Sequence, residues 1–177
     1  MIRIYVPQLT ERLSYIFRYV FDERLGIAYS LIDEWDNFNN NTTFPKIIYA
    51  PDYSREGFYM QAVSLLFETE IKEQNPCLSW QDELPLCFQT ESIKSALPFD
   101  IFAACFYFLS RYEEYLSSDT DEHGRFKAEN SFAYKNQILE IALVDRWIDY
   151  FGKILKQHVY KHILLDRLCF IINEIET

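Results

Sequence analysis

The chain is poor in the residues that mark disordered, fibrous or disulfide-stapled proteins. Its 177 residues include only four glycines, six prolines and four cysteines. Collagen-like and linker-like chains are therefore excluded, and 49% hydrophobic with 25% charged residues is a globular composition. A chain of this length buries a sizeable core without staples, so we expect one globular domain over residues 1–177. The cysteines form no C-x-x-C pair and lie largely in apolar runs, which predicts reduced thiols.

Positive charge and long apolar runs are also scarce. Seventeen Lys and Arg face 27 Asp and Glu, for a net charge of −10. This charge disfavours binding to phosphate backbones or to anionic membranes, so we expect neither a nucleic-acid nor a membrane partner. The longest apolar run, residues 101–109, is far shorter than the roughly 20 residues that span a bilayer. The first residues lack the apolar stretch of a signal peptide, which predicts a cytoplasmic protein.

Motifs for common cofactors are missing as well. The sequence has no glycine-rich phosphate loop, no G-x-S-x-G elbow and no zinc-ribbon cysteine spacing. We therefore expect no cofactor and no metal.

Hydrophobic periodicity predicts an α+β fold. β-branched runs indicate strands at 2–6, 27–32 and 46–50, with weaker candidates at 57–60 and 86–89. Helical spacing predicts helices at 10–25, 99–116 and 144–165, and the last is a candidate to extend over 156–177. The Asn-rich stretch 33–44 is typical of a loop. The expected architecture is a single domain with a short mixed sheet and about three main helices, with a three-layer α/β fold as the alternative.

Four segments, in this order and spacing, carry a family resemblance: LLFETEIKEQ (65–74), PFDIFAACFYFLSRYEEYL (98–116), DEHGRFKAENSFAYKNQIL (121–139) and IALVDRW (141–147). Together they resemble the N-terminal domain, of unassigned function, that precedes the catalytic domain in a group of bacterial polysaccharide deacetylase family proteins. The resemblance covers about residues 1–155. It implies a domain joined to a deacetylase-like barrel, which is a potential partner, as is a second copy of the chain.

The catalytic motifs of those deacetylases are not in this chain. The family uses an Asp-Asp pair and two histidines spaced i, i+4, and no Asp-Asp dipeptide occurs here. His158 and His162 have the i, i+4 spacing, but the nearest upstream carboxylates, Asp145 and Asp149, are too far along a helix to share one ion. We interpret the histidines as a surface or core-edge pair.

The first polar cluster lies at the end of the apolar 99–116 helix. Arg111 and Glu114 are spaced i, i+3, so a half-buried ion pair is expected on one helix face. Arg111 could instead clamp an anionic ligand, with Glu113 or Glu114 as general base. We favour the structural interpretation.

The second cluster is His123-Gly124-Arg125, followed by Tyr134 and Lys135. These residues could converge on one ligand, with His123 as a proton carrier. The simpler hypothesis, which we favour, is a turn in which Gly124 has a positive φ and Arg125 pairs with a nearby acidic residue.

Three functions are consistent with these patterns. The leading hypothesis is a non-catalytic accessory or interaction domain of a polysaccharide-deacetylase-like system. A small hydrolase or ligand-binding enzyme that uses the Arg/Glu/His cluster is the first alternative. A carbohydrate-binding module is the second, because Trp35 and Trp80 fall in loop-like segments and indole faces stack on sugar rings.

Overall fold

A four-stranded parallel sheet lies at the centre of the fold, with strand order β2-β1-β3-β4. The computed structural model describes the backbone of residues 1–40, 43–52, 57–116 and 119–175, and the side chains of these residues up to 159. The strands are β1 (Ile2–Tyr5), β2 (Tyr29–Ile32), β3 (Lys46–Ala50) and β4 (Phe58–Gln61). Ile4 pairs with Leu31 on one side and with Ile47 on the other, so β1 is an interior strand.

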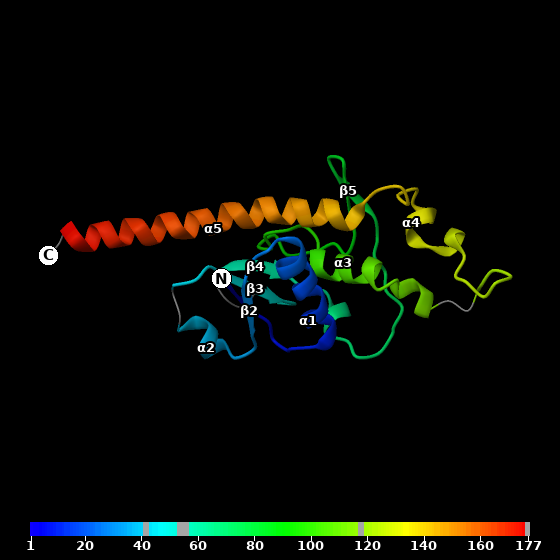
Figure 1. Cartoon of the computed structure of the whole chain (residues 1–177), viewed down its shortest axis with the longest axis horizontal. Coiled ribbons are helices and arrows are strands. Elements are labelled where there is room, and N and C mark those ends of the chain that lie inside the picture. Colours follow the sequence, from blue (N-terminus) through cyan, green and yellow to red (C-terminus); the bar gives the residue numbers. More distant parts are fainter. Residues whose placement is uncertain (41–42, 53–56, 117–118, 176–177) are drawn as a thin grey trace.

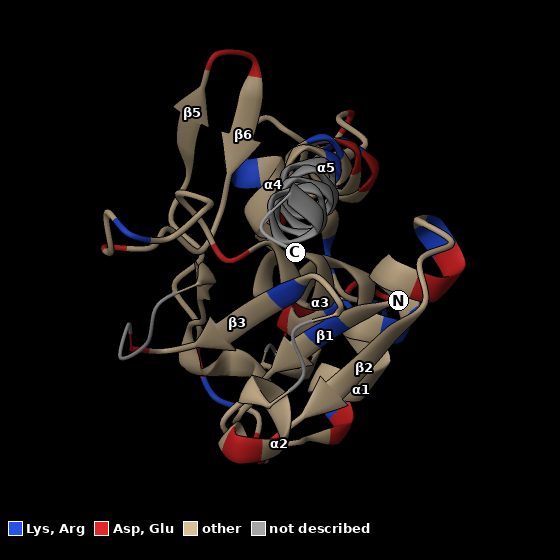
Figure 2. Ribbon diagram, turned by 90° about the vertical axis from the view of Figure 1, so that its left-hand side faces the viewer, with Lys and Arg blue, Asp and Glu red and all other residues tan. Residues whose placement is uncertain are grey.

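Alternating side chains divide the sheet into two buried faces. Ile4, Ile47 and Met60 point into the main core, whereas Ile48 and Tyr59 point into a smaller cluster on the opposite face. Helices α1 (Glu11–Phe17), α3 (Ile101–Leu109) and α5 (Leu143–Ile175) cover the main face, and the short α2 (Trp35–Asn39) covers the other. Figure 2 shows α2 and α5 on opposite sides of the strands.

The first helix begins and ends as its sequence predicts, but its second half is wider than an α-helix. The Thr10 hydroxyl accepts the Leu13 N–H at 3.1 Å, which caps α1. Residues Arg18–Arg24 continue it as a π-helical stretch, η1, and Gly26 follows with a φ of 63°. This left-handed glycine lets the chain turn directly into β2.

Helix α3 is buried on every side because its nine residues are all apolar. Its N-cap, Asp100, accepts hydrogen bonds from the backbone N–H groups of Phe102 and Ala103 at 3.1 and 3.0 Å. The helix stops at Leu109 rather than at residue 116, because Arg111 is left-handed and residues Tyr112–Tyr115 form a separate 3-10 turn, η3.

The last helix, α5, starts at Leu143 and packs against α3. In Figure 1 its first part lies over α3 and the sheet, and its remainder extends past the other elements toward the C-terminus. Its buried Trp147 donates an indole N–H to Pro85 O at 2.6 Å, which ties it to the two-stranded hairpin β5 (Ser79–Gln81) and β6 (Leu84–Leu86). The helix continues beyond residue 156 to Ile175, and residues 176–177 lie outside the described part of the chain. Among the described residues, no helix is long and apolar enough to cross a membrane.

The predicted α+β class and single domain are confirmed, with three corrections of detail. Parallel and antiparallel pairings lie in two separate sheets. The strand expected at 86–89 is β6, two residues earlier. The stretch predicted as a loop at 33–44 contains α2, where Trp35 contacts Tyr5 and Phe38 with ring centroids 5.2 Å away in both cases. The shorter elements are η2 (Ser64–Leu66), η4 (Ala128–Asn130) and α4 (Phe132–Lys135).

Candidate functional site

The predicted pair of Arg111 and Glu114 forms, but not on a helix face. With its left-handed backbone, φ 54°, Arg111 lies beyond the end of α3, and its Nε forms an ion pair with Glu114 Oε1. The Arg111 side chain is 73% exposed and that of Glu114 30% exposed, so the expectation of a half-buried pair is wrong for the arginine. Exposed pairs of this kind contribute about 1 kcal/mol or less. The pair spans the start of η3.

His123, Gly124 and Arg125 form the tight turn that we favoured from the sequence. Gly124 has a φ of 74°, and Asp121 organises the turn by accepting the backbone N–H groups of His123 and Arg125 at 2.8 and 2.9 Å. The Arg125 side chain donates to the same carboxylate at 3.1 Å. His123 lies 3.4 Å from Glu122 at the surface. These polar groups stabilise the turn.

The two clusters remain apart. Within the described residues, no hydrogen bond or ion pair joins the Arg111–Glu114 pair to His123 or Arg125. Each of the two arginines forms an ion pair within its own cluster, Arg111 with Glu114 three residues away and Arg125 with Asp121 four residues away. An enzymatic site built on these four groups would need them around one substrate, and the contacts do not place them so.

Two other predicted residues, Glu113 and Lys135, lie at the two ends of the short helix α4. Glu113, half-buried, accepts the backbone N–H of Phe132 at 2.6 Å through Oε1, at the start of α4. Lys135 lies at the end of the same short helix. Burial raises the pKa of Glu113, although the Phe132 N–H and the positive charge of Lys135 partly offset this. Tyr134, 49% exposed, is on α4 as well but does not line the hollow that the other two share.

Glu113 and Lys135 line a surface hollow of about 760 Å³, which we call the polar groove. Residues 73–76 form one side of it together with residues from the end of α3, from η3 and from the segment that leads into α4. Its side chains are those of Glu73, Gln74, Asn75, Pro76, Tyr107, Glu113, Leu116, Asp119, Phe126, Asn130, Phe132 and Lys135.

The polar groove combines aromatic, amide and acidic groups. Tyr107 is buried at its base, whereas Phe126 and Phe132 are partly exposed in it. Three carboxylates line it against one lysine. One of the three, Asp119, binds Lys127 at 2.6 Å and Asn130 at 2.9 Å. The other two lining carboxylates, Glu73 and Glu113, form no ion pair with a described residue.

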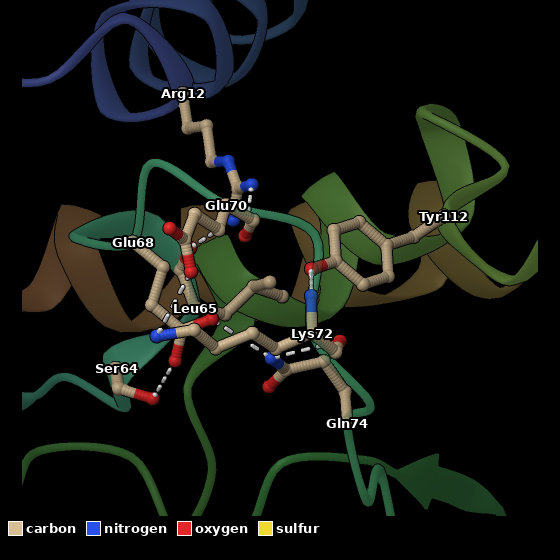
Figure 3. A network of polar contacts seen from close by, with 8 residues as sticks. All are labelled: Arg12, Ser64, Leu65, Glu68, Glu70, Lys72, Gln74 and Tyr112. Atoms are coloured by element: carbon tan, nitrogen blue, oxygen red, sulfur yellow. Dashed lines mark hydrogen bonds and ion pairs between the residues drawn. The ribbon is translucent and has the colours of Figure 1, made fainter. Parts of the chain in front are cut away.

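One wall of the polar groove is held by a network of polar contacts, shown in Figure 3. Arg12 of α1 donates to Leu65 O at 2.9 Å and to Glu70 O at 2.8 Å. The backbone N–H of Lys72 donates to the Tyr112 hydroxyl at 2.9 Å. Gln74 donates to Glu68 Oε2 at 3.0 Å. The segment that leads into residues 73–76 is thereby fastened both to α1 and to η3.

Asp100 is the one buried charged residue of the described core. Besides capping α3, its Oδ2 accepts the Tyr49 hydroxyl at 2.7 Å and the Val63 N–H at 2.8 Å. Burial raises its pKa from 3.8 to about 6, although all four hydrogen bonds act in the opposite direction. Asp100 is enclosed and fully bonded. Its hydrogen bonds connect three parts of the fold: strand β3, the segment that follows β4, and the start of helix α3.

Of the predicted histidine pair, His158 packs against the sheet at β3 and β4. The His158 ring stacks on Phe58 with centroids 4.1 Å apart, and its Nε2 lies 3.2 Å from Lys46 O. The side chain of His162 lies outside the described residues. No group of three or more His, Cys, Asp or Glu residues suited to a metal ion occurs among those that are described.

A second hollow of about 760 Å³ is mainly apolar, and we call it the apolar groove. It lies between α5 and the N-terminal ends of β1 and β3. Its apolar lining consists of Met1, Ile2, Leu25, Ile27, Phe44, Pro45, Leu155 and Val159. Gly152 of α5 lets the helix approach Leu25, because a Cβ there would lie 3.2 Å from Leu25 Cδ2. Asp149, Lys153 and Lys156 are its charged residues.

Comparison with known proteins places the chain in a family. A family model described as a family of unknown function (DUF7033) matches residues 2–160, and the chain belongs to that family. No curated protein and no solved structure matches the chain.

Proposed function

We propose that this DUF7033 domain is a non-catalytic accessory domain of a polysaccharide-deacetylase-like system in the cytoplasm, and that a deacetylase-like barrel docks in its apolar groove. The link to deacetylases comes from the four sequence segments that resemble the domain preceding such barrels. The observation that carries the docking role is the apolar groove itself. Soluble proteins bury most apolar surface of this kind, and exposed apolar hollows are typical of interaction sites.

The arrangement of the charged residues supports a non-catalytic role. Arg111, Glu114 and Arg125 each take part in a local ion pair, and Asp100 is sealed in the core. These groups stabilise turns and a helix start. The alternative of a small hydrolase based on Arg111, Glu114, His123 and Arg125 lacks the convergence that a shared substrate would require.

Docking can be measured with a recombinant barrel from a polysaccharide deacetylase whose own N-terminal domain resembles this chain. We expect calorimetric titration to detect binding to the wild-type chain and to find at least tenfold weaker binding for Phe44→Asp. A charge at that position would be desolvated in the complex without a partner. Leu139→Asp is the control, because Leu139 is an exposed apolar residue outside the apolar groove, whereas Phe44 is partly buried in it. Equal binding by both variants would contradict docking there.

Catalysis is tested separately by acetate release from N-acetylglucosamine oligomers. The wild-type chain and a triple variant, Arg111→Ala, Glu114→Ala and His123→Ala, should release acetate at the same background rate. Release by the wild type that the triple variant loses at unchanged Tm would establish the hydrolase alternative instead. Sedimentation velocity over a hundredfold concentration range shows whether a second copy, rather than a barrel, associates with the chain.

A further inference from the structure

The polar groove has the composition of a saccharide-binding surface. Sugar rings present apolar C–H faces that pack on aromatic side chains, and hydroxyl groups that bond to amides and carboxylates. Phe126 and Phe132 provide the first kind of contact, and Asn75 and Asn130 the second. The volume of about 760 Å³ lies within the range of pockets that hold small organic ligands. The groove can therefore accept a short oligosaccharide.

The charge of the polar groove narrows the class of sugar. Asp119 is already matched by Lys127, so Glu73 and Glu113 outweigh the single lining cation, Lys135. Glu113 uses Oε1 to hold the Phe132 N–H, and no hydrogen bond from the described residues reaches its Oε2. A half-buried carboxylate that lines a groove and has an oxygen left to bond is a strong acceptor for an ammonium group. Anionic sugars would be repelled.

The geometry points to a binding site for oligosaccharides that carry free amino groups, with Glu113 and Glu73 binding the ammonium groups. The choice of a sugar rests on the proposed function, whereas the preference for a cation rests on the groove alone. A deacetylase acting on an N-acetylated sugar creates free amines, so this site would hold the product, or a partly processed chain, near the enzyme.

The surrounding contacts keep the site preformed. The Figure 3 network fixes the wall that ends in Glu73 and Gln74, through Arg12 and Tyr112. The opposite wall is fixed by Glu113 on the start of α4 and by the Phe108–Phe132 ring contact at 6.3 Å. Because both walls are ordered by bonds within the chain, little conformational entropy is lost when a sugar binds.

Titration of the full chain with four probes tests the site. The probes are a glucosamine tetramer, an N-acetylglucosamine tetramer, cellotetraose and spermine, followed by calorimetry and by amide chemical shifts at pH 6. We expect the glucosamine tetramer to bind at least tenfold more tightly than each other probe. Shifts should concentrate at residues 73–76, 113 and 126–135. Equal binding of spermine, or no binding of the glucosamine tetramer, would overturn the proposal.

Variants locate the binding residues. Glu113→Gln keeps an acceptor for the Phe132 N–H, so the fold is retained, and we expect about tenfold weaker binding of the glucosamine tetramer. Glu73→Gln should weaken binding several-fold. Glu140→Gln and Trp80→Ala are controls outside the polar groove and should bind like the wild type. If Trp80→Ala abolishes binding while Glu113→Gln does not, the sugar site lies on the hairpin and this proposal is wrong.

The outcome can be separated from that of the proposed function. Barrel docking depends on the apolar groove and is read with Phe44→Asp, whereas sugar binding is read with Glu113→Gln. A chain that docks the barrel but ignores the glucosamine tetramer refutes only the sugar site. A chain that binds the tetramer but not the barrel refutes only the docking role.

Discussion

Replacing Tyr49 with phenylalanine tests the role of the buried carboxylate that joins sheet and helix. The Tyr49 hydroxyl donates to Asp100 Oδ2 at 2.7 Å, and both residues are buried. Tyr49→Phe removes this bond but keeps the ring contacts with Phe17 and Phe102. Hydrogen bonds to charged groups contribute roughly 1.5–3 kcal/mol, so we expect the variant to lose about 2 kcal/mol of unfolding free energy at pH 8.

The loss should depend on pH, because Asp100 titrates in the folded protein at about 6 and in the unfolded chain near its ordinary value of 3.8. The folded state thus binds the Asp100 proton more tightly than the unfolded chain does. This proton binding stabilises the fold fully below pH 4, and the stabilisation is lost as the pH rises through 6. The shift corresponds to about 3 kcal/mol. Below pH 6 the Tyr49 bond reaches a neutral carboxyl, which makes it weaker, and the effect of Tyr49→Phe should fall to about 1 kcal/mol at pH 5.

Urea unfolding followed by circular dichroism at pH 5, 6, 7 and 8 measures this difference. Tyr59→Phe is the matched control, because the Tyr59 hydroxyl donates to two backbone carbonyls, Ala50 O and Pro51 O, at 3.0 Å each. Carbonyl groups do not titrate, so its cost should stay constant over this range. If Tyr49→Phe costs the same unfolding free energy at pH 5 as at pH 8, the raised pKa of Asp100 is refuted.

Three further predictions concern other parts of the fold. Trp147→Phe should destabilise the chain by about 2 kcal/mol in urea unfolding, since it leaves the buried Pro85 carbonyl without its donor; an unchanged midpoint would contradict this. Gly26→Ala should cost about 1 kcal/mol at its left-handed φ of 63°, and Gly26→Asn less, because asparagine tolerates this conformation; equal stabilities would count against the turn geometry. Iodoacetamide mapped by peptide mass spectrometry should modify exposed Cys77 long before Cys87 and Cys105, since burial raises the pKa of Cys87 to about 12; early labelling of Cys105 would contradict the packing of α3.

The sequence predicted those elements that local chemistry determines. The strand–helix–strand opening was recognisable because Pro7, Thr10 and Gly26 mark its boundaries, and the cap of α3 because Asp100 precedes an apolar run. The end of α3 was not predicted, because residues 110–116 are acceptable in a helix. The chain departs there since Tyr112 becomes buried and accepts the Lys72 N–H, a contact 40 residues away in sequence. Likewise α2 forms because Phe38 and Trp35 cover the second face of the sheet.

In the candidate site, too, local features were predictable from the sequence and features built by distant contacts were not. Turn chemistry predicted that Arg125 pairs with a nearby acidic residue, because all parts of the turn lie within a few residues, and that residue is Asp121. The polar groove had no such signal: Glu73, Glu113 and Lys135 line one hollow only because of the break after α3 and the bond from Phe132 to Glu113. The left-handed Arg111 thus has a consequence beyond its own ion pair. By ending α3 early it turns η3 so that Glu113 reaches α4. A continuous helix through residue 116 would instead have followed the axis of α3, and the groove would lack its half-buried carboxylate.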